Sequence, residues 1–185
     1  MEQQQIFLNY AKADKEEMKV LARELEKYGN SVSALSKDEK NEPLRQMLQD
    51  IENSQAMLAC FSEGFSQQPL CQIALGMAYA RGVPVLGVTP NRKEMPPALE
   101  NAGLPVYQLE EMDGLVELFS VLDPTAKPVQ LVHMAQDVLE ELKRLWEKKE
   151  KPKKARQQKD DLEYYEEIIS LLKNDKKTDK VYRKR

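Results

Sequence analysis

Apolar residues in the first 122 positions form short runs that alternate with amphipathic stretches. The runs predict buried strands at 6–10, 31–36, 56–61, 83–89 and 105–109. Between them, apolar residues recur every three or four positions, as on one face of a helix. These helices are expected at 13–29, 43–54, 70–82, near 98–102 and at 113–122. Because apolar strands alternate with helices, we expect an α/β fold, with a five-stranded parallel sheet covered on both faces.

A second pattern follows the segment DPTAKP, which we interpret as a linker at residues 123–128. Apolar side chains then recur at helical spacing at Leu131, Met134, Val138, Leu142 and Leu145. They predict an amphipathic helix at 129–149, and a second is expected at 160–174 before a basic tail. We therefore divide the chain into an α/β domain, 1–124, and a helical extension, 125–185, that packs on the domain or on a partner copy.

Charge and composition exclude several classes of function. Lys and Arg number 28 against 31 Asp and Glu, and the net charge of −3 gives no support for nucleic-acid binding. No run approaches the roughly 18 apolar residues that a membrane helix needs, and the first ten residues do not resemble a signal peptide. With only two cysteines, the expected location is the cytoplasm. His133 is the only histidine and no metal-ligand cluster appears, so we expect no metal.

Ligands of parallel sheets bind at the carboxyl ends of the strands. The loops after the first three predicted strands, at 9–14, 36–43 and 62–69, are therefore the places to look for a site. Neither glycine pattern of the common phosphate-binding loops, GxGxxG or GxxxxGK[ST], occurs in the chain. A Rossmann or P-loop assignment is excluded on this ground.

Two segments, IFLNYAKADKEEMKVLARELEKYG at 6–29 and FSEGFSQQPLCQIAL at 61–75, resemble the motifs of TIR domains. The opening, IFLNYAKADKEEMKVLARELEKYG, is similar to the family's first strand, short polar motif and amphipathic helix, with Asn9, Tyr10, Ala11 and Asp14 at the motif positions. The segment FSEGFSQQPLCQIAL resembles the family's Ser-x-Asn-[Phe/Tyr]-x-x-Ser-x-Trp-Cys-x-x-Glu-Leu. Its matches are Ser62, Phe65, Cys71 and Leu75, whereas Gly64 replaces the Asn and Leu70 the Trp. The resemblance spans about residues 5–122 and implies a flavodoxin-like sheet.

Many TIR domains bind NAD as a substrate and cleave its nicotinamide–ribose bond, and some bacterial ones make nucleotide signals in antiphage defence. A carboxylate stabilises the positive ribose in such a cleavage. The resemblance places that catalytic Glu at Ala74. It also implies that NAD or a related nucleotide is bound by Asn9, Tyr10, Ala11, Ser36, Lys37, Ser62, Leu70 and Cys71.

A second family resemblance also places a Glu at the position of Ala74. The segment ALGMAYARGVPV is similar to nucleoside deoxyribosyltransferases, which also have a Glu at this position. Those enzymes carry an Asp-rich stretch before the helix, and SEGFSQQPLCQ has none. The departure favours the TIR interpretation, although both families act on N-glycosidic bonds.

Three explanations of Ala74 stay open. The chain is an NAD glycohydrolase or cyclase whose Glu was altered, so that it binds nucleotide and turns over about 10² to 10³ times more slowly. Alternatively, it is a non-catalytic TIR-like scaffold that forms homo-oligomers through loop 36–43 and the C-terminal helices. In a third explanation, Glu63 supplies the carboxylate in place of residue 74. The remaining loops resemble those of active members, which favours the altered enzyme.

Overall fold

The computed structural model describes residues 4–34, 43–90 and 103–150, together with residues 162 and 166. Its contacts divide the chain into two compact units, Met1–Lys143 and Arg144–Arg185. The first unit holds the whole sheet. The expected helix near 98–102 and most of the one at 160–174 lie outside the described residues.

A single parallel sheet of five strands forms the centre of the first unit, in the order β2-β1-β3-β4-β5. The strands are β1 (Gln5–Asn9), β2 (Ser31–Ala34), β3 (Ala56–Cys60), β4 (Val85–Thr89) and β5 (Val106–Gln108). All five predicted strands are confirmed. β1 lies one residue earlier than predicted, β3, β4 and β5 are shorter than predicted, and the last two residues of the second predicted strand lie outside the described residues. The fourth begins after Pro84 and the fifth after Pro105, because proline has no N–H to donate to a neighbouring strand.

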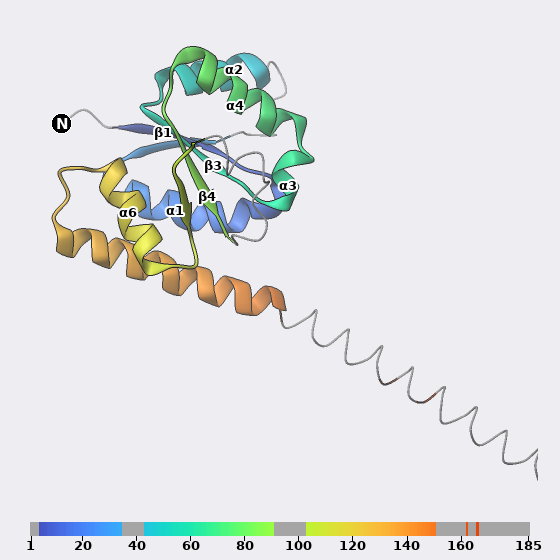
Figure 1. Cartoon of the computed structure of the whole chain (residues 1–185), viewed down its shortest axis with the longest axis vertical. Helices are drawn as coiled ribbons and strands as arrows, with labels where there is room; N and C mark the ends of the chain where they lie inside the picture. The colour runs from blue at the N-terminus through green and yellow to red at the C-terminus, as the bar shows by residue number, and fades with distance from the viewer. Residues whose placement is uncertain (1–3, 35–42, 91–102, 151–161, 163–165, 167–185) are drawn as a thin grey trace, which may run out of the picture. The chain divides into compact units, whose positions relative to one another are not determined.

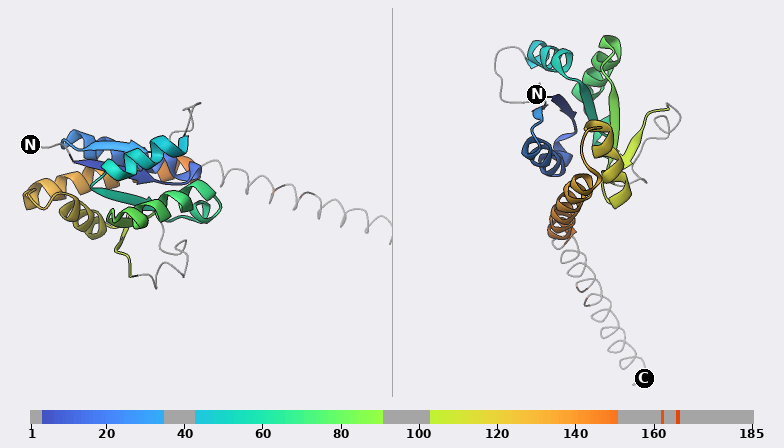
Figure 2. Two further views of the ribbon diagram at one scale, coloured as in Figure 1. Left: turned by 90° about the horizontal axis from the view of Figure 1, so that it is seen from above. Right: turned by 90° about the vertical axis from the view of Figure 1, so that its left-hand side faces the viewer.

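Helices cover both faces of the sheet, as the sequence predicts. They are α1 (Lys15–Lys27), preceded by the 3-10 turn η1 (Lys12–Asp14), and α2 (Pro43–Asn53), α3 (Glu63–Ser66), α4 (Pro69–Arg81), α6 (Met112–Leu122) and a helix over 128–150. Figures 1 and 2 show α2 and α4 on one face, with α1 and α6 on the other. The short helix α3 is a correction, because its residues were expected to form a loop.

The core beneath α2 and α4 is apolar. Side chains alternate between the two faces of a strand, so Phe7 and Met57 point to this side, whereas Ile6, Leu8 and Leu58 point to the other. The cluster on the α2–α4 side consists of Phe7, Met47, Ile51, Met57, Ala59, Phe61, Phe65, Cys71, Ala74, Ala78 and Val85, all buried. It fills the space between sheet and helices beside the ends of β1 and β3.

The first part of the helix over 128–150 packs against the domain. Its buried residues are Leu131, Met134, Ala135, Val138 and Leu142, which confirms four of the five predicted positions, whereas Leu145 is half-buried. Two ion pairs join it to α1: Lys27 binds Asp137 at 2.8 Å, and Arg23 binds Glu141. Residues 128–143 therefore belong to the first compact unit, and the domain boundary at 124 stays a prediction.

Candidate functional site

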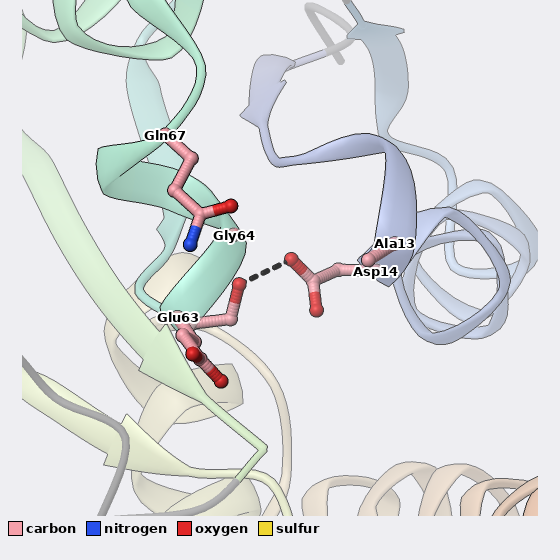
Figure 3. Close-up of a pocket in the computed structure, with 6 residues that line it drawn as sticks. Ala13, Asp14, Glu63, Gly64 and Gln67 are labelled. Carbon is pink, nitrogen blue, oxygen red and sulfur yellow. Dashed lines mark hydrogen bonds between the residues drawn. The ribbon is translucent and has the colours of Figure 1, made fainter.

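The strand order creates a crevice between the ends of β1 and β3. Chain connections leave β1 toward β2 on one side and β3 toward β4 on the other, and ligands of open α/β sheets bind at such a reversal point. A pocket of about 380 Å³ lies between the loops that follow these two strands (Figure 3). Its lining consists of Ala13, Asp14, Ser62, Glu63, Gly64 and Gln67. The pocket therefore lies between η1, just before α1, and the short helix α3.

A buried hydrogen bond crosses this crevice. Ser62 donates from Oγ to Oδ2 of Asp14 at 2.5 Å, and both residues are buried (Figure 3). Hydrogen bonds to an ionised carboxylate are short and among the stronger ones in proteins. A second link runs from the backbone N–H of Lys12 to Oε1 of Gln68 at 3.3 Å. These contacts hold the two loops in one arrangement.

Asp14 has a different role from the one that its position suggests. It occupies the N-cap of α1, a position where Asp commonly accepts a hydrogen bond from the first free N–H groups of the helix. Here its side chain forms no capping hydrogen bond. The side chain reaches Ser62, 48 positions further along the chain, instead.

Close packing of the two loops also explains Gly64. A Cβ atom at this position would lie 3.1 Å from Cβ of Ala11, closer than most Cβ contacts. A side chain at residue 64 would therefore require the end of β1 or α3 to move by a few tenths of an ångström, which is consistent with a glycine at this motif position.

On the α4 side of the sheet, Asn9 links β1 to α4. Its Nδ2 donates to the backbone carbonyl oxygen of Cys71 at 2.8 Å. Asn9 is fully buried, and within the described residues its Oδ1 has no hydrogen-bond partner. An unsatisfied buried polar atom costs about 1–3 kcal/mol, so a donor that reached Oδ1 would stabilise this end of the strand.

Comparison with known proteins identifies the family. The family model described as "TIR domain" matches residues 6–118. The chain belongs to the TIR domain family. The nucleoside deoxyribosyltransferase resemblance stays a hypothesis.

Two solved structures that are similar to this chain are TIR domains of other proteins. The TIR domain of the Toll-related receptor TRR-2 from Hydra magnipapillata is 18% identical, with a TM-score of 0.49, covering 72% of this chain and 96% of that one. The TIR domains of the activated Roq1 resistosome, which recognises the pathogen effector XopQ, are 13% identical, with a TM-score of 0.41, covering 74% and 84%. A search of curated proteins found no match.

The structure brings part of the predicted ligand set of the TIR domain together. Asn9 and Cys71 are in contact, and Ala11 and Ser62 flank Gly64 at the pocket. Leu70 is half-buried at the start of α4. The predicted residues Ser36 and Lys37 lie outside the described residues.

Tyr10 is half-buried directly after β1. Burial raises the pKa of its phenol above the ordinary value of 10.0, Lys19 opposes the shift, and Glu16 adds to it. The hydroxyl is therefore neutral at physiological pH and can donate a hydrogen bond.

Ala74 is fully buried, at 0% exposure, in the second turn of α4. It belongs to the apolar cluster under α2 and α4 and does not line the pocket. The pocket instead contains two carboxyl groups, from Asp14 and Glu63, and the amide of Gln67. Of the lining residues, the predicted ligand set contained Ser62 alone, with Glu63 only as a substitute carboxylate; the motifs did not identify the others, Ala13, Asp14, Gly64 and Gln67, as ligand-binding residues. Their position in loops at the strand ends was the available signal.

Two kinds of feature do not occur within the described part of the chain. No group of three or more His, Cys, Asp and Glu side chains is placed to hold a metal ion. Among the same residues, no helix has the length and apolar character needed to cross a membrane.

Proposed function

We propose that this TIR domain is a non-catalytic interaction module. The single observation that carries the proposal is the burial of Ala74 in the apolar cluster. This is the position at which the family motif has its catalytic Glu. Alanine has no polar group to contribute to the reaction, and Ala74 belongs to the apolar cluster rather than to the lining of the pocket.

The surroundings of Ala74 support a native alanine rather than a vacated catalytic position. Other members of the cluster include Phe7, Met57 and Phe65, whose side chains offer no hydrogen bond to a carboxylate. An isolated charge in such surroundings costs several kcal/mol. Alanine, the best helix former, fits this turn of α4 without that cost. As a module, the protein would act by association, through loop 36–43 and the C-terminal helices.

A second candidate is the NAD glycohydrolase or cyclase activity, with a nucleotide signal in antiphage defence as its purpose. One observation favours it. The buried Oδ1 of Asn9, which has no partner among the described residues, could accept a hydrogen bond from a bound nucleotide. On this view the chain binds NAD and cleaves it slowly, and a carboxylate at position 74 would restore the rate.

One set of variants separates the two candidates. Wild type, Ala74→Glu and the matched control Ala80→Glu, which is exposed on the same helix, are incubated with NAD at several protein concentrations. Released nicotinamide is measured by chromatography, and circular dichroism checks that each variant is folded. The interaction module predicts no release from any of them. Release by wild type, or by Ala74→Glu and not by Ala80→Glu, would establish the enzyme.

Two further measurements need no substitution. An increase in the melting temperature of wild type with NAD would support nucleotide binding, and its absence would support the module. Molar mass measured by light scattering should rise with protein concentration if the module self-associates. A chain that stays monomeric at every concentration would contradict the homo-oligomer.

A further inference from the structure

One surface of the domain is covered by a helix that a short linker joins to it. Residues 128–143, the first part of the helix over 128–150, lie along α1 and α6 (Figures 1 and 2). We call these residues the docked segment. An amphipathic helix that buries one apolar stripe can dock in the same way on a second copy of the surface. The buried positions of the docked segment, each at most 8% exposed, are Leu131, Met134, Ala135, Val138 and Leu142.

Matched charges fix the register of the docked segment on α1. Lys27 binds Asp137 at 2.8 Å, and Arg23 binds Glu141. On each helix the two charged residues are four positions apart, so the cations form one row and the carboxylates another. Residue numbers fall along α1 as they rise along the docked segment, which makes the two helices antiparallel. In both pairs α1 supplies the cation and the docked segment the carboxylate, so the two surfaces are complementary in charge.

The linker, residues 123–127, is held by local contacts. Thr125 donates to the carboxylate of Asp123 from its N–H at 3.0 Å and from its hydroxyl at 2.6 Å. The backbone hydrogen bonds of this stretch likewise join residues within 119–131. Within the described residues, none of these bonds ties the linker to the sheet, so it can open without loss of a tertiary hydrogen bond. When extended, it spans about 20 Å.

Three exposed valines flank the same linker. Val121 is 47% exposed near the end of α6, and Val129 and Val132 are 66% and 38% exposed at the start of the docked segment. If two copies exchange this helix, their linkers pass each other near the two-fold axis of a closed dimer. Each copy can then cover the valines of the other. Burial of this apolar surface would favour exchange over docking within one chain, which leaves the valines in water.

We propose that two copies of this chain exchange their docked segments, so that residues 128–143 of each copy lie on α1 of the other. The proposal names the surface and the partner of the self-association in the proposed function, and it rests on that self-association. In the exchanged dimer the same apolar stripe and the same two ion pairs form between chains instead of within one. The two-fold axis closes the assembly at two copies.

Charge reversal on one side of the contact at a time tests the exchange. The α1 variant is Arg23→Glu, Lys27→Glu, and the segment variant is Asp137→Lys, Glu141→Arg. Alone, each variant places like charges opposite each other. When the two are mixed, only exchange restores all four ion pairs. We expect the heterodimer to exceed each homodimer by about tenfold, because four exposed pairs of modest strength change from mismatched to matched. Native mass spectrometry with one variant ¹⁵N-labelled separates the species, and circular dichroism checks folding.

Two controls separate exchange from simple attraction between oppositely charged proteins. Lys12→Glu, Lys15→Glu has the same net charge as the α1 variant, but its changes lie at exposed positions outside the two ion pairs. Mixed with the segment variant, it should give no excess of heterodimer. The quadruple variant, which carries all four reversals, should dimerise with itself and not with wild type. This second control also tests the proposal if a one-sided variant fails to fold.

A third comparison tests the valines beside the linker. Val121→Ser, Val129→Ser should weaken dimerisation of the otherwise unchanged chain by about tenfold or more, because apolar surface covered in the dimer is lost. Leu44→Ser, at a position 49% exposed on α2, should leave dimerisation unchanged.

The proposal is overturned if the α1 and segment variants form no excess of heterodimer, or if the Lys12→Glu, Lys15→Glu control forms as much. It is also overturned if wild type pairs with the quadruple variant as readily as with itself. A wild-type chain that self-associates while these tests fail would keep the interaction module and reject the exchange. Release of nicotinamide from NAD by wild type would instead reject the non-catalytic module and leave the result of the exchange test standing.

Discussion

Gly87 offers the sharpest test of the packing in the sheet. It lies in the middle of β4, paired with Ala59 of β3 and Val106 of β5. A Cβ atom at this position would lie 2.8 Å from Cε2 of Phe61 and 2.8 Å from Cγ2 of Val106. Real Cβ contacts are longer, so the Phe61 ring, the Val106 side chain or a strand must move. We therefore predict that Gly87→Ala destabilises the domain.

The magnitude follows from the geometry. Extra methyl groups in a packed core cost about 1–3 kcal/mol. For a chain of 150–250 residues, each kcal/mol lowers the melting temperature by about 2–4 °C. The same substitution at Gly76, inside α4, has the opposite sign, because no heavy atom lies within 4 Å of the added Cβ. Alanine is favoured over glycine in a helix by about 0.5–1 kcal/mol, so Gly76→Ala should stabilise.

Urea unfolding followed by circular dichroism measures both free energies. The double variant Gly87→Ala, Val106→Ala removes one of the two clashing side chains, so its loss should be smaller than the sum of the single losses. A Gly87→Ala protein as stable as wild type would refute the close approach of Phe61 and Val106 to β4. So would equal effects, in sign and size, at Gly87 and Gly76.

Three other measurements test the buried polar and apolar positions. Ala74→Glu should lower the free energy of unfolding by about 3–5 kcal/mol at pH 7, and part of this loss should be regained at pH 5 as the carboxyl group protonates. The exposed control Ala80→Glu should change the free energy of unfolding little. An equally small loss for Ala74→Glu would mean that position 74 opens to solvent. Ser62→Ala should lower the free energy of unfolding by about 1.5–3 kcal/mol, because the Ser62 hydroxyl donates to a carboxylate. The control Ser66→Ala, at an exposed position, should leave it nearly unchanged. Equal losses from the two variants would contradict the hydrogen bond between Ser62 and Asp14. Burial raises the pKa of Glu24 above its ordinary 4.5, and Lys27 opposes the shift. Because the folded state therefore keeps its proton to higher pH than the unfolded state, the free energy of unfolding should fall as pH rises from about 4.5 through the raised pKa. Glu24→Gln should flatten that slope in urea titrations at several pH values, and an unchanged slope would rule out Glu24 as its source.

Periodicity alone predicted most of the architecture. Continuous apolar runs indicated all five strands, because strands of a covered parallel sheet are buried on both faces. The stripe from Leu131 to Leu142 predicted a buried helical face correctly. The residues IFLNY and FSEGFSQQPLC were also enough to suggest the TIR domain family, which the match over 6–118 confirms.

The sequence by itself thus determined the elements, their alternation and the family, because these depend on local periodicity and on motifs. Only the tertiary structure decided how residues far apart in the chain meet. Asp14 forms a hydrogen bond with Ser62 rather than with its own helix, and the backbone of Gly64 lies so near the end of β1 that an added Cβ would be 3.1 Å from Cβ of Ala11. The same holds for Ala74: the motif shows only that an alanine stands where the family pattern has a Glu, whereas its burial belongs to a cluster with side chains from three strands and three helices. Such contacts have no periodic signature, because they are set by how the elements pack.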